Sequence, residues 1–505
     1  MKSTQQVNPL NKFLAWVEAI GNKLPDPITL FFILAIITII LSAIASGLNL
    51  SVTHPGTGET INAVSLLTPA SIRQIVTEAV ANFVNYPPLG TVLVAMLGVG
   101  VAESSGLLSA LLRKSVLSAP AGIITPVIVF AGIMSNLASD AGYVVLTPLG
   151  ALVFLAFGRH PLVGLAAAFA GVSGGFSANL IVSSLEPLLA GITEGAAQLI
   201  DPSATVNPLA NYYFMAASTI LITLIGWYIT DRIVEPRLGR YTGEQNLEAN
   251  SLSSSESKGL KWAGLALLAG VTFFLVMVLP AQGILRDPEN FTIVPSPFFQ
   301  GIVPITMVLF LFPSIVYGKV TGSIRNDKDV AAALAESMSS MGYYIALAFI
   351  TAQFLAYFKW SNLGIILAIQ GANFLQSTGF TGLPLLVTFI LVSAFINLFI
   401  GSASAKWNLI APVFVPMLML VGYSPEFTQL AYRIGDSTTN IITPLMPYFP
   451  VVVAMGCKYD KNLGIGTFIS MMLPYSIAFL IGWTIFFMIW FSLGIPLGPG
   501  ASVYL

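Results

Sequence analysis

The chain has 505 residues, of which 56% are hydrophobic and only 9% are charged, and its mean hydropathy is +0.85. This composition excludes an ordinary water-soluble protein and predicts an integral membrane protein. A formal net charge of -1 with 21 lysines and arginines offers no basic surface for nucleic acid, and the single cysteine excludes an intramolecular disulfide and a multi-cysteine metal site. The polar loops are too short for a separate catalytic domain, so we do not expect an enzyme.

The first predicted span runs from about Ile28 to Leu48, which is long enough to cross about 30 Å of hydrocarbon. Lysines in the polar segment before it place the N-terminus in the cytoplasm, and that segment lacks the pattern of a cleavable signal peptide. A second span from about Pro88 brings the chain to Arg113 and Lys114, whose charges indicate a cytoplasmic end.

Two interrupted segments complete an N-terminal half at residues 1–230. Residues 115–158 are apolar but contain SNLASDAG, and basic residues flank both ends, which predicts a hairpin that is either re-entrant or made of two short spans. A broken helix at about 161–191 then crosses outward, and a span at Tyr212–Thr230 returns. Residues 231–262 follow as a cytoplasmic linker, whose SLSSSESK stretch is typical of a flexible connection.

The C-terminal half, residues 263–505, contains a second hairpin and a second broken helix. Its predicted elements are spans near Ala263–Gly283 and Phe299–Gly318, a span from about Gly342, the hairpin at about 381–422, the broken helix at about 427–453 and a last span at Ile465–Leu493. No Lys or Arg flanks the second hairpin, which places it on the opposite side from the first. The predicted fold class is an all-α polytopic membrane protein with about nine transmembrane helices plus two opposed hairpins in inverted structural repeats.

A short sequence repeat supports this division. Three residues, Pro148, Gly158 and Pro161, recur 264 positions later as Pro412, Gly422 and Pro425. A small polar run follows each copy, GGFSANLIVS at Gly174–Ser183 and GDSTTNIITP at Gly435–Pro444. Backbone that leaves helical geometry at bilayer depth is tolerated only where it is buried in protein or lines a wet cavity. Two matched interruptions therefore predict one solute site and a secondary transporter.

Charged residues in the apolar segments are few, and each costs roughly 2.5 to 3.5 kcal/mol at the centre of a bilayer. They are Glu103, Asp140, Glu186, Lys406, Arg433 and Asp436. Arg433 and Asp436 are three residues apart, which on a helix places them on one face and within reach of an ion pair. Either they neutralise each other, or Arg433 faces an anionic solute while Asp436 exchanges a proton or holds a cation.

The polar interruptions offer ligands for a coupling ion. Asn179 and Asn440 occupy matching places in the two breaks, with Ser177 opposite Thr438. Amide and hydroxyl oxygens are hard ligands suited to Na⁺, so a sodium site near Asn179 and Asn440 is one interpretation. The other is that these side chains cap orphan backbone groups.

The hairpin turns carry further polar groups of this kind. They are Ser135, Asn136, Ser139 and Asp140 in the first hairpin, and Ser402, Ser404, Lys406, Trp407 and Asn408 in the second. Asn136 joins the candidate ion ligands. Trp407 is either an interfacial anchor or a ring that stacks on an aromatic solute, and Asn397 before this turn is either a helix contact or part of the site.

Extended motifs make the chain resemble the p-aminobenzoyl-glutamate transporter (AbgT) family over nearly its whole length. They include IGNKLPDP, GRHPLVGLAAAFAGVSGGFSANL, TDRIVEPRLG, GSASAKWNLIAPVFVPM and GIPLGPG. The resemblance implies a homodimer of nine-span subunits in the bacterial inner membrane, working as an ion-coupled elevator. It also implies substrate-binding roles for Asn397, Trp407, Pro425, Arg433 and Asp436, and for an acid that is normally Asp. Here that acid is Glu186, which is either an exchanging carboxylate or a helix cap.

The function that the resemblance implies is coupled transport of p-aminobenzoyl-glutamate and related aromatic acids, with export of sulfonamide antimetabolites. A proton or Na⁺ would be the coupling ion, and no cofactor is expected. A Na⁺-coupled carrier of dicarboxylates is the alternative within transporters. An intramembrane aspartyl protease using Asp140 and Asp436 is disfavoured because RIGD has Arg433 where the GxGD pattern has glycine. A channel is a third interpretation.

Overall fold

The computed structural model describes residues 25–53, 58–138, 142–243, 252–293, 296–446, 448–461 and 463–505. Within them the chain is almost entirely helical, which confirms the all-α polytopic class. The predicted cytoplasmic N-terminus, and Ser139 and Asp140 in the first hairpin, lie outside the described residues.

Seven helices among the described residues are long and apolar enough to cross a membrane, or eight if the bent pair at residues 327–360 counts as one span. One of the seven, Ala403–Val421, is an arm of the second hairpin, which the prediction did not count as a span. Both broken helices are divided into pieces too short to qualify. The predicted number of about nine spans therefore stays a prediction.

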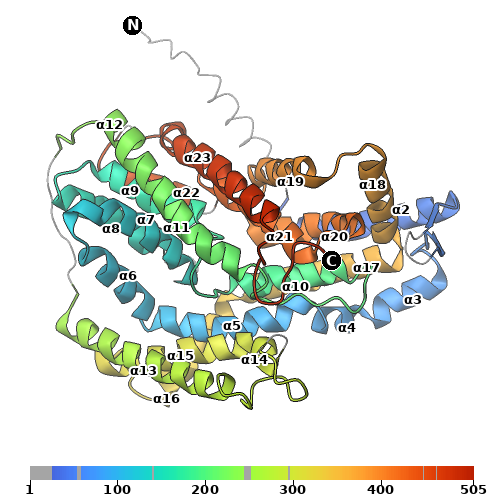
Figure 1. Cartoon of the computed structure of the whole chain (residues 1–505), viewed down its shortest axis with the longest axis horizontal. Helices are drawn as coiled ribbons and strands as arrows, with labels where there is room; N and C mark the ends of the chain where they lie inside the picture. Colours follow the sequence, from blue (N-terminus) through green and yellow to red (C-terminus); the bar gives the residue numbers. More distant parts are fainter. Residues whose placement is uncertain are drawn as a thin grey trace, which may run out of the picture.

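The N-terminal elements form an edge of the molecule (Figure 1). They are α2 at Pro27–Gly47, β1 at Ser51–Thr53, β2 at Thr60–Asn62, α3 at Pro69–Thr77 and α4 at Ala79–Val84. The carboxylate of Asp26 caps α2 by accepting from the N–H of Ile28. The strands pair antiparallel, with Val52 opposite Ile61, and α2 packs along α17.

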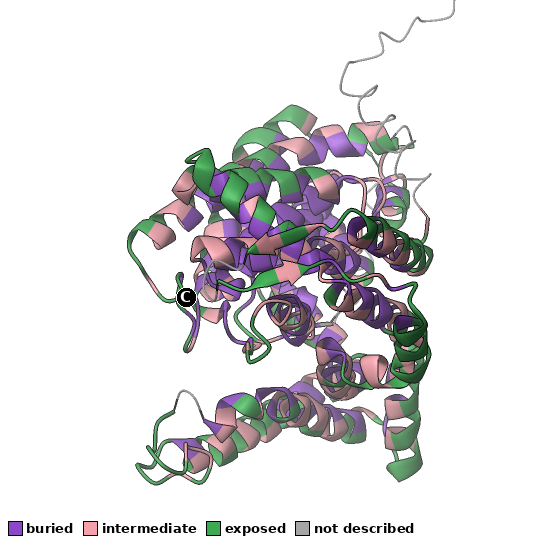
Figure 2. Cartoon of the chain, turned by 90° about the vertical axis from the view of Figure 1, so that its right-hand side faces the viewer, coloured by how far each residue is buried: buried purple, intermediate pink, exposed green. Residues whose placement is uncertain are grey.

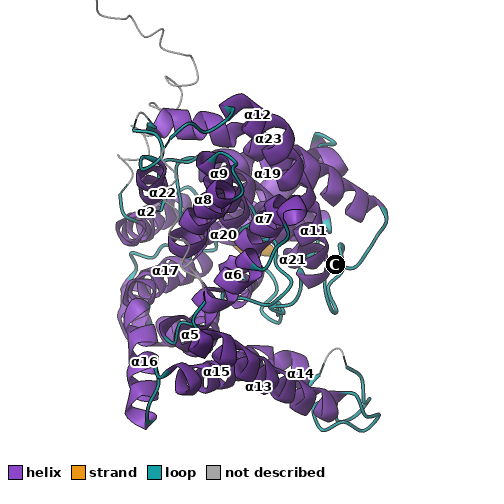
Figure 3. Cartoon of the chain, turned by 90° about the vertical axis from the view of Figure 1, so that its left-hand side faces the viewer, coloured by secondary structure: helices purple, strands orange, loops and turns teal. Residues whose placement is uncertain are grey.

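Four helices form a layer on one side of α5 at Pro87–Ser104, seen below it in Figures 1 and 3. They are α13 at Ser254–Val278, α14 at Pro297–Gln300, α15 at Ile302–Thr321 and α16 at Asp327–Ser340. Three more helices lie outside this layer: α6 at Leu107–Leu117, α17 at Gly342–Trp360 and α18 at Leu363–Ser377. Because α5 packs against α15 on one side and α10 at Leu185–Ala197 on the other, it joins this layer to an inner body of helices within residues 124–238 and 382–492. Figure 2 shows the buried residues concentrated in that body.

The inner body contains two groups of helices with the same succession: a hairpin, a broken helix and a long helix. The first group is α7 at Ile124–Met134, α8 at Thr147–Ala156, α9 at Pro161–Phe169, α10 at Leu185–Ala197, α11 at Tyr212–Ile229 and α12 at Glu235–Leu238. The second is α19 at Gly382–Asn397, α20 at Ala403–Val421, α21 at Pro425–Asn440, α22 at Phe449–Gly456 and α23 at Ile465–Ser492.

The repeated glycine and proline have a physical role in this succession. Gly158 and Gly422 adopt positive φ, 70° and 105°, just after α8 and α20, where a side chain would be strained. Pro161 and Pro425 are the first residues of α9 and α21, where the missing N–H costs no helix hydrogen bond. Each pair therefore ends a hairpin and starts the broken helix that follows.

The structure differs from the prediction in the segment between the halves. The span expected to end at Thr230 continues through a π-helical turn to Leu238. The SLSSSESK stretch, expected to be a flexible linker, mostly forms the start of α13. Ser253 and Glu256 cap this helix reciprocally, since each side chain accepts from the other's backbone N–H. Residues 244–251 lie outside the described part of the chain.

Three further elements differ from expectation. The helices α16 and α18 fall in segments where the sequence predicted none. In the second broken helix, the polar run at Gly435–Pro444 was predicted to interrupt the helix, but its residues as far as Asn440 form the end of α21. Tertiary hydrogen bonds to neighbouring helices hold this polar turn in helical form.

Close packing of α8 on α9 depends on two glycines that face each other. A Cβ at Gly164 would overlap the carbonyl of Gly150, and a Cβ at Gly150 would lie 2.6 Å from the carbonyl oxygen of Gly164. We predict that Gly164→Ala lowers the free energy of unfolding by about 1 to 3 kcal/mol, because neither backbone can yield without moving its helix. Thermal unfolding in detergent measures the effect.

The matched control is Gly90→Ala on α5, where an added Cβ meets no atom within 4 Å. This variant should unfold at or above the wild-type temperature, since alanine favours helix over glycine. Equal melting temperatures for the two variants would contradict the packing argument.

Candidate functional site

The first break and the end of α21 meet at the centre of the inner body. Residues 175–184 are not helical, and within them the N–H of Ser177 donates to Oγ of Ser437 at 3.1 Å. Arg433 donates from Nη2 to the carbonyl oxygen of Ser177 at 3.2 Å. The last turns of α21 therefore supply partners for backbone that α9 leaves unpaired.

Arg433 forms an ion pair with Glu186, at the start of α10. Its Nη2 lies 2.9 Å from Oε1 of Glu186, and the two side chains are 1% and 10% exposed. The other oxygen, Oε2, accepts from N and Oγ of Ser183 at 2.6 and 2.7 Å. Glu186 thus caps the start of α10 and also neutralises Arg433, while its role as an exchanging carboxylate stays a prediction.

A second ion pair joins the second hairpin to α21. Nζ of Lys406, on α20, lies 2.5 Å from Oδ1 of Asp436, and both side chains are almost completely buried. Lys406 also donates to Oδ1 of Asn397, the last residue of α19. The two arms of the second hairpin, α19 and α20, therefore meet at the ion pair of Lys406 with Asp436.

We call these two contacts the crossed pairs: Arg433 with Glu186, and Lys406 with Asp436. The sequence spacing had placed Arg433 and Asp436 within reach of each other, but each pairs with a residue on another element. The arrangement links α10, α20 and α21 through charge. Removing one member of a buried pair leaves an uncompensated charge, which typically costs 3 to 5 kcal/mol.

Gly435 allows α19 to pack closely against α21, and amide hydrogen bonds from Asn397 stabilise the contact. A Cβ at Gly435 would overlap the carbonyl of Ile390, so only glycine allows this approach. Nδ2 of Asn397 lies 2.6 Å from the carbonyl oxygen of Asp436 and 2.9 Å from Oδ1 of Asn440. Asn397 is therefore both a helix contact and a neighbour of the crossed pairs.

Trp407 is buried beside the crossed pairs. Its ring stacks on Tyr432 with centroids 4.3 Å apart, and its Nε1 donates to Oγ1 of Thr193 at 2.9 Å. The hydroxyl of Tyr432 donates to the carbonyl oxygen of Ala403 at 2.6 Å. One face of the indole is thus covered by Tyr432 in this conformation. The ring is 0% exposed, which argues against an anchor at the membrane–water interface.

The predicted ion ligands are only partly brought together. Oδ1 of Asn179 accepts from the N–H of Ile181 at 3.2 Å, which is a local turn contact, while Asn440 pairs with Asn397. Thr438 donates from Oγ1 to the carbonyl oxygen of Ile434 within its own helix at 2.9 Å. Of these contacts, only that of Asn179 satisfies a backbone group of a break, so the capping interpretation fits Asn179 but not Asn440 or Thr438.

Two buried oxygens of the predicted ion set have no hydrogen-bond partner among the described residues: Oδ1 of Asn136 and Oγ of Ser177. Asn136 belongs to the tip of the first hairpin, where its Nδ2 donates to the carbonyl oxygen of Ile133 at 3.0 Å. Nε of Arg433 is also unpaired. Unsatisfied groups of this kind are costly unless something binds to them.

The other candidates contribute differently. Pro425 is the buried first residue of α21, about two turns before Arg433. Glu103 is exposed on the last turn of α5. Sequence reasoning missed Tyr432 and Thr193, and it gave Lys406 no role. The available signal for that role was a lysine within the apolar sequence of the second hairpin.

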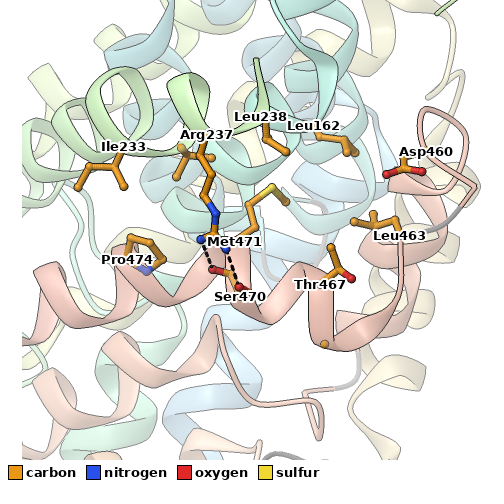
Figure 4. A pocket seen from close by; sticks show the side chains of 12 residues that line it. Leu162, Ile233, Arg237, Leu238, Asp460, Leu463, Thr467, Ser470, Met471 and Pro474 are labelled. Carbon is orange, nitrogen blue, oxygen red and sulfur yellow. Dashed lines mark hydrogen bonds between the residues drawn. The ribbon is translucent and has the colours of Figure 1, made fainter. Parts of the chain in front are cut away.

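Two surface cavities lie apart from the crossed pairs. One of about 280 Å³ is lined by residues of α9, α12 and α23, and Figure 4 shows Arg237 reaching from α12 to Ser470 on α23. A larger one of about 810 Å³ lies between α5, α10 and α15 and includes Glu194 and Glu426. The helix α10 lines the larger cavity and carries Glu186 on its first turn.

Two solved structures share this architecture. The YdaH transporter of Alcanivorax borkumensis is 46% identical, with a TM-score of 0.91 over 94% of this chain and 100% of that chain. MtrF of Neisseria gonorrhoeae, described with a class of antimetabolite efflux pumps, is 51% identical, with a TM-score of 0.92 over 97% of this chain and 100% of that chain.

The sequence comparisons agree. The p-aminobenzoyl-glutamate transport protein of Escherichia coli K12 is 39% identical over 99% of this chain and 98% of its own length. The model of the AbgT putative transporter family matches residues 12–505. The relatives are transporters and not enzymes, as the sequence predicted. The chain belongs to the AbgT putative transporter family, a family of multi-pass membrane transporters.

Proposed function

We propose that this protein is a secondary active transporter of p-aminobenzoyl-glutamate and related aromatic acids, coupled to a proton or sodium gradient across the bacterial inner membrane. The printed substrate of the E. coli relative supports the substrate class. The observation that carries the proposal is the set of crossed pairs, four buried charges at the meeting point of a helix break and a hairpin. Charges so placed mark a substrate or ion pathway in membrane proteins.

Arg433 is the proposed receptor for a substrate carboxylate. Its guanidinium carries five N–H donors: those of Nη2 contact Glu186 and Ser177, while Nε has no partner in the described part of the chain. The planar fork of arginine matches a carboxylate bidentately, which a lysine cannot reproduce. A second carboxylate of a dianionic substrate needs a second cation nearby.

Asp436 and Glu186 are the proposed proton-exchanging groups, because an anion can enter a neutral buried site only if a carboxylate loses its charge or gains a cation. A sodium ion is the alternative, with the unpaired oxygens of Asn136 and Ser177 and the nearby Asn179 and Asn440 as the ligand region. Both couplings stay within the proposal.

Trp407 is the proposed contact for the aromatic ring of the substrate. Since Tyr432 covers one face of the indole, stacking requires either the opposite face or a rotation of Tyr432. We propose in addition an elevator motion of the inner body, inverted repeats, a homodimer and export of sulfonamide antimetabolites. The efflux description of MtrF supports the last of these.

The first prediction about transport concerns Asp436. We expect Asp436→Asn to lose uphill accumulation of p-aminobenzoyl-glutamate by at least about tenfold, since the isosteric amide exchanges no proton and lacks the negative charge that attracts Na⁺. Downhill exchange of labelled for unlabelled substrate should remain. Both are measured in proteoliposomes with the exposed Asp201→Asn as control. Wild-type accumulation by Asp436→Asn would remove this carboxylate from the mechanism.

A further prediction concerns the arginine proposed to bind a substrate carboxylate. Arg433→Lys should weaken binding of p-aminobenzoyl-glutamate by about tenfold or more, because the bidentate contact is lost. The exposed Arg232→Lys should have no effect.

Competition experiments separate the two substrate classes. We expect p-aminobenzoate to inhibit uptake of p-aminobenzoyl-glutamate and succinate not to inhibit it. Inhibition by succinate alone would instead favour the Na⁺-coupled dicarboxylate carrier.

A further inference from the structure

Lys406 is a buried charge to which the proposed function gives no task. It lies in the first turns of α20, and its side chain is 0% exposed. A lysine on a lipid-facing helix would extend to the headgroups, but this side chain points into the inner body and ends beside Asp436. A buried ammonium makes insertion of its helix into the membrane less favourable, so its presence points to a functional role.

The surroundings of the ammonium resemble the surroundings of a bound cation. Nζ contacts a carboxylate oxygen of Asp436 and the amide oxygen of Asn397, and it lies 5.6 Å from the ring centroid of Tyr432. Carboxylate and amide oxygens are the ligands that hard cations prefer, and the aromatic face adds attraction for any positive charge. Two elements other than the lysine's own helix, α19 and α21, supply these groups.

We propose that the ammonium of Lys406 is a tethered cation that occupies the coupling site at Asp436 until a proton or Na⁺ replaces it. The released ammonium then binds a carboxylate of the substrate. This inference rests on the proposed function and deepens it, because it names the device that couples the ion to the anion.

The charge balance of the site explains the coupling. With both crossed pairs formed, the four side chains sum to zero. An anion that enters alone must break a pair and leave a buried carboxylate without a cation, which is strongly unfavourable. A cation that binds Asp436 removes that penalty. By linkage the substrate must strengthen cation binding by the same factor, so the anion and the cation bind together.

Lysine suits this task better than the arginine of the other pair. Its four-carbon stem is flexible and carries a compact charge, so it can leave one partner and reach another. Arg433 also donates to the carbonyl oxygen of Ser177 and so fixes the break that follows α9. We infer that Lys406 moves during binding while Arg433 stays in place.

The test compares cation binding by purified wild-type protein and Lys406→Gln in detergent. Without the tethered ammonium, the charge of Asp436 should bind the external cation about tenfold more tightly or better, a factor within the usual range of coupling between sites. Equilibrium binding of ²²Na⁺ and proton uptake seen with a pH indicator cover the two candidate ions. Unchanged affinity for both ions overturns the proposal.

A second measurement adds p-aminobenzoyl-glutamate. The wild type should take up a cation when substrate is added, whereas Lys406→Gln should not, because its cation is already bound. The double variant Lys406→Gln with Asp436→Asn leaves no unpaired buried charge, so it should fold even if the single variant does not. It should bind substrate with less linked cation uptake than the wild type, because only Glu186 is left to exchange a proton, and linked uptake at the wild-type level overturns the proposal.

These outcomes separate the inference from the proposed function. If the wild type binds no p-aminobenzoyl-glutamate, the proposed substrate is wrong, but the comparison of cation affinities without substrate still decides the role of Lys406. If the wild type binds substrate and Lys406→Gln keeps the same cation linkage, the substrate stands and the tethered cation is refuted.

Discussion

The crossed pairs are the constraint on which the rest of the inner body depends. Four charges are buried where three helices and a broken segment converge, and each is compensated by a residue from a different element. Because an unpaired charge at this depth is costly, α10, α20 and α21 can separate only when another ion or an anionic solute takes a partner's place. The same contacts that hold the site together therefore make its opening sensitive to ligands.

The helix breaks and glycines serve this convergence. The break after α9 leaves backbone groups that Arg433 and Ser437 satisfy, and Gly435 lets α19 approach until Asn397 reaches the end of α21. Non-helical backbone at this depth is tolerated because it is enclosed by protein. Trp407 stacks on Tyr432 of α21 and donates to Thr193 of α10, which ties the second hairpin to both helices.

Much of this fold was predictable because glycine, proline and apolar length act locally. Gly158 with Pro161, and Gly422 with Pro425, indicated where each hairpin ends. Ion partners were not predictable, since the spacing rule for one helix favoured Arg433 with Asp436 whereas residues far along the chain provide the actual partners. Composition also misled at SLSSSESK, where the capping pair Ser253 and Glu256 was the stronger local signal.

The most direct test of this account is a structure determined with p-aminobenzoyl-glutamate bound. The account predicts a ligand carboxylate in contact with Arg433 or Lys406, and Nζ of Lys406 withdrawn from Asp436. A bound ligand elsewhere, with both crossed pairs still formed, would contradict it.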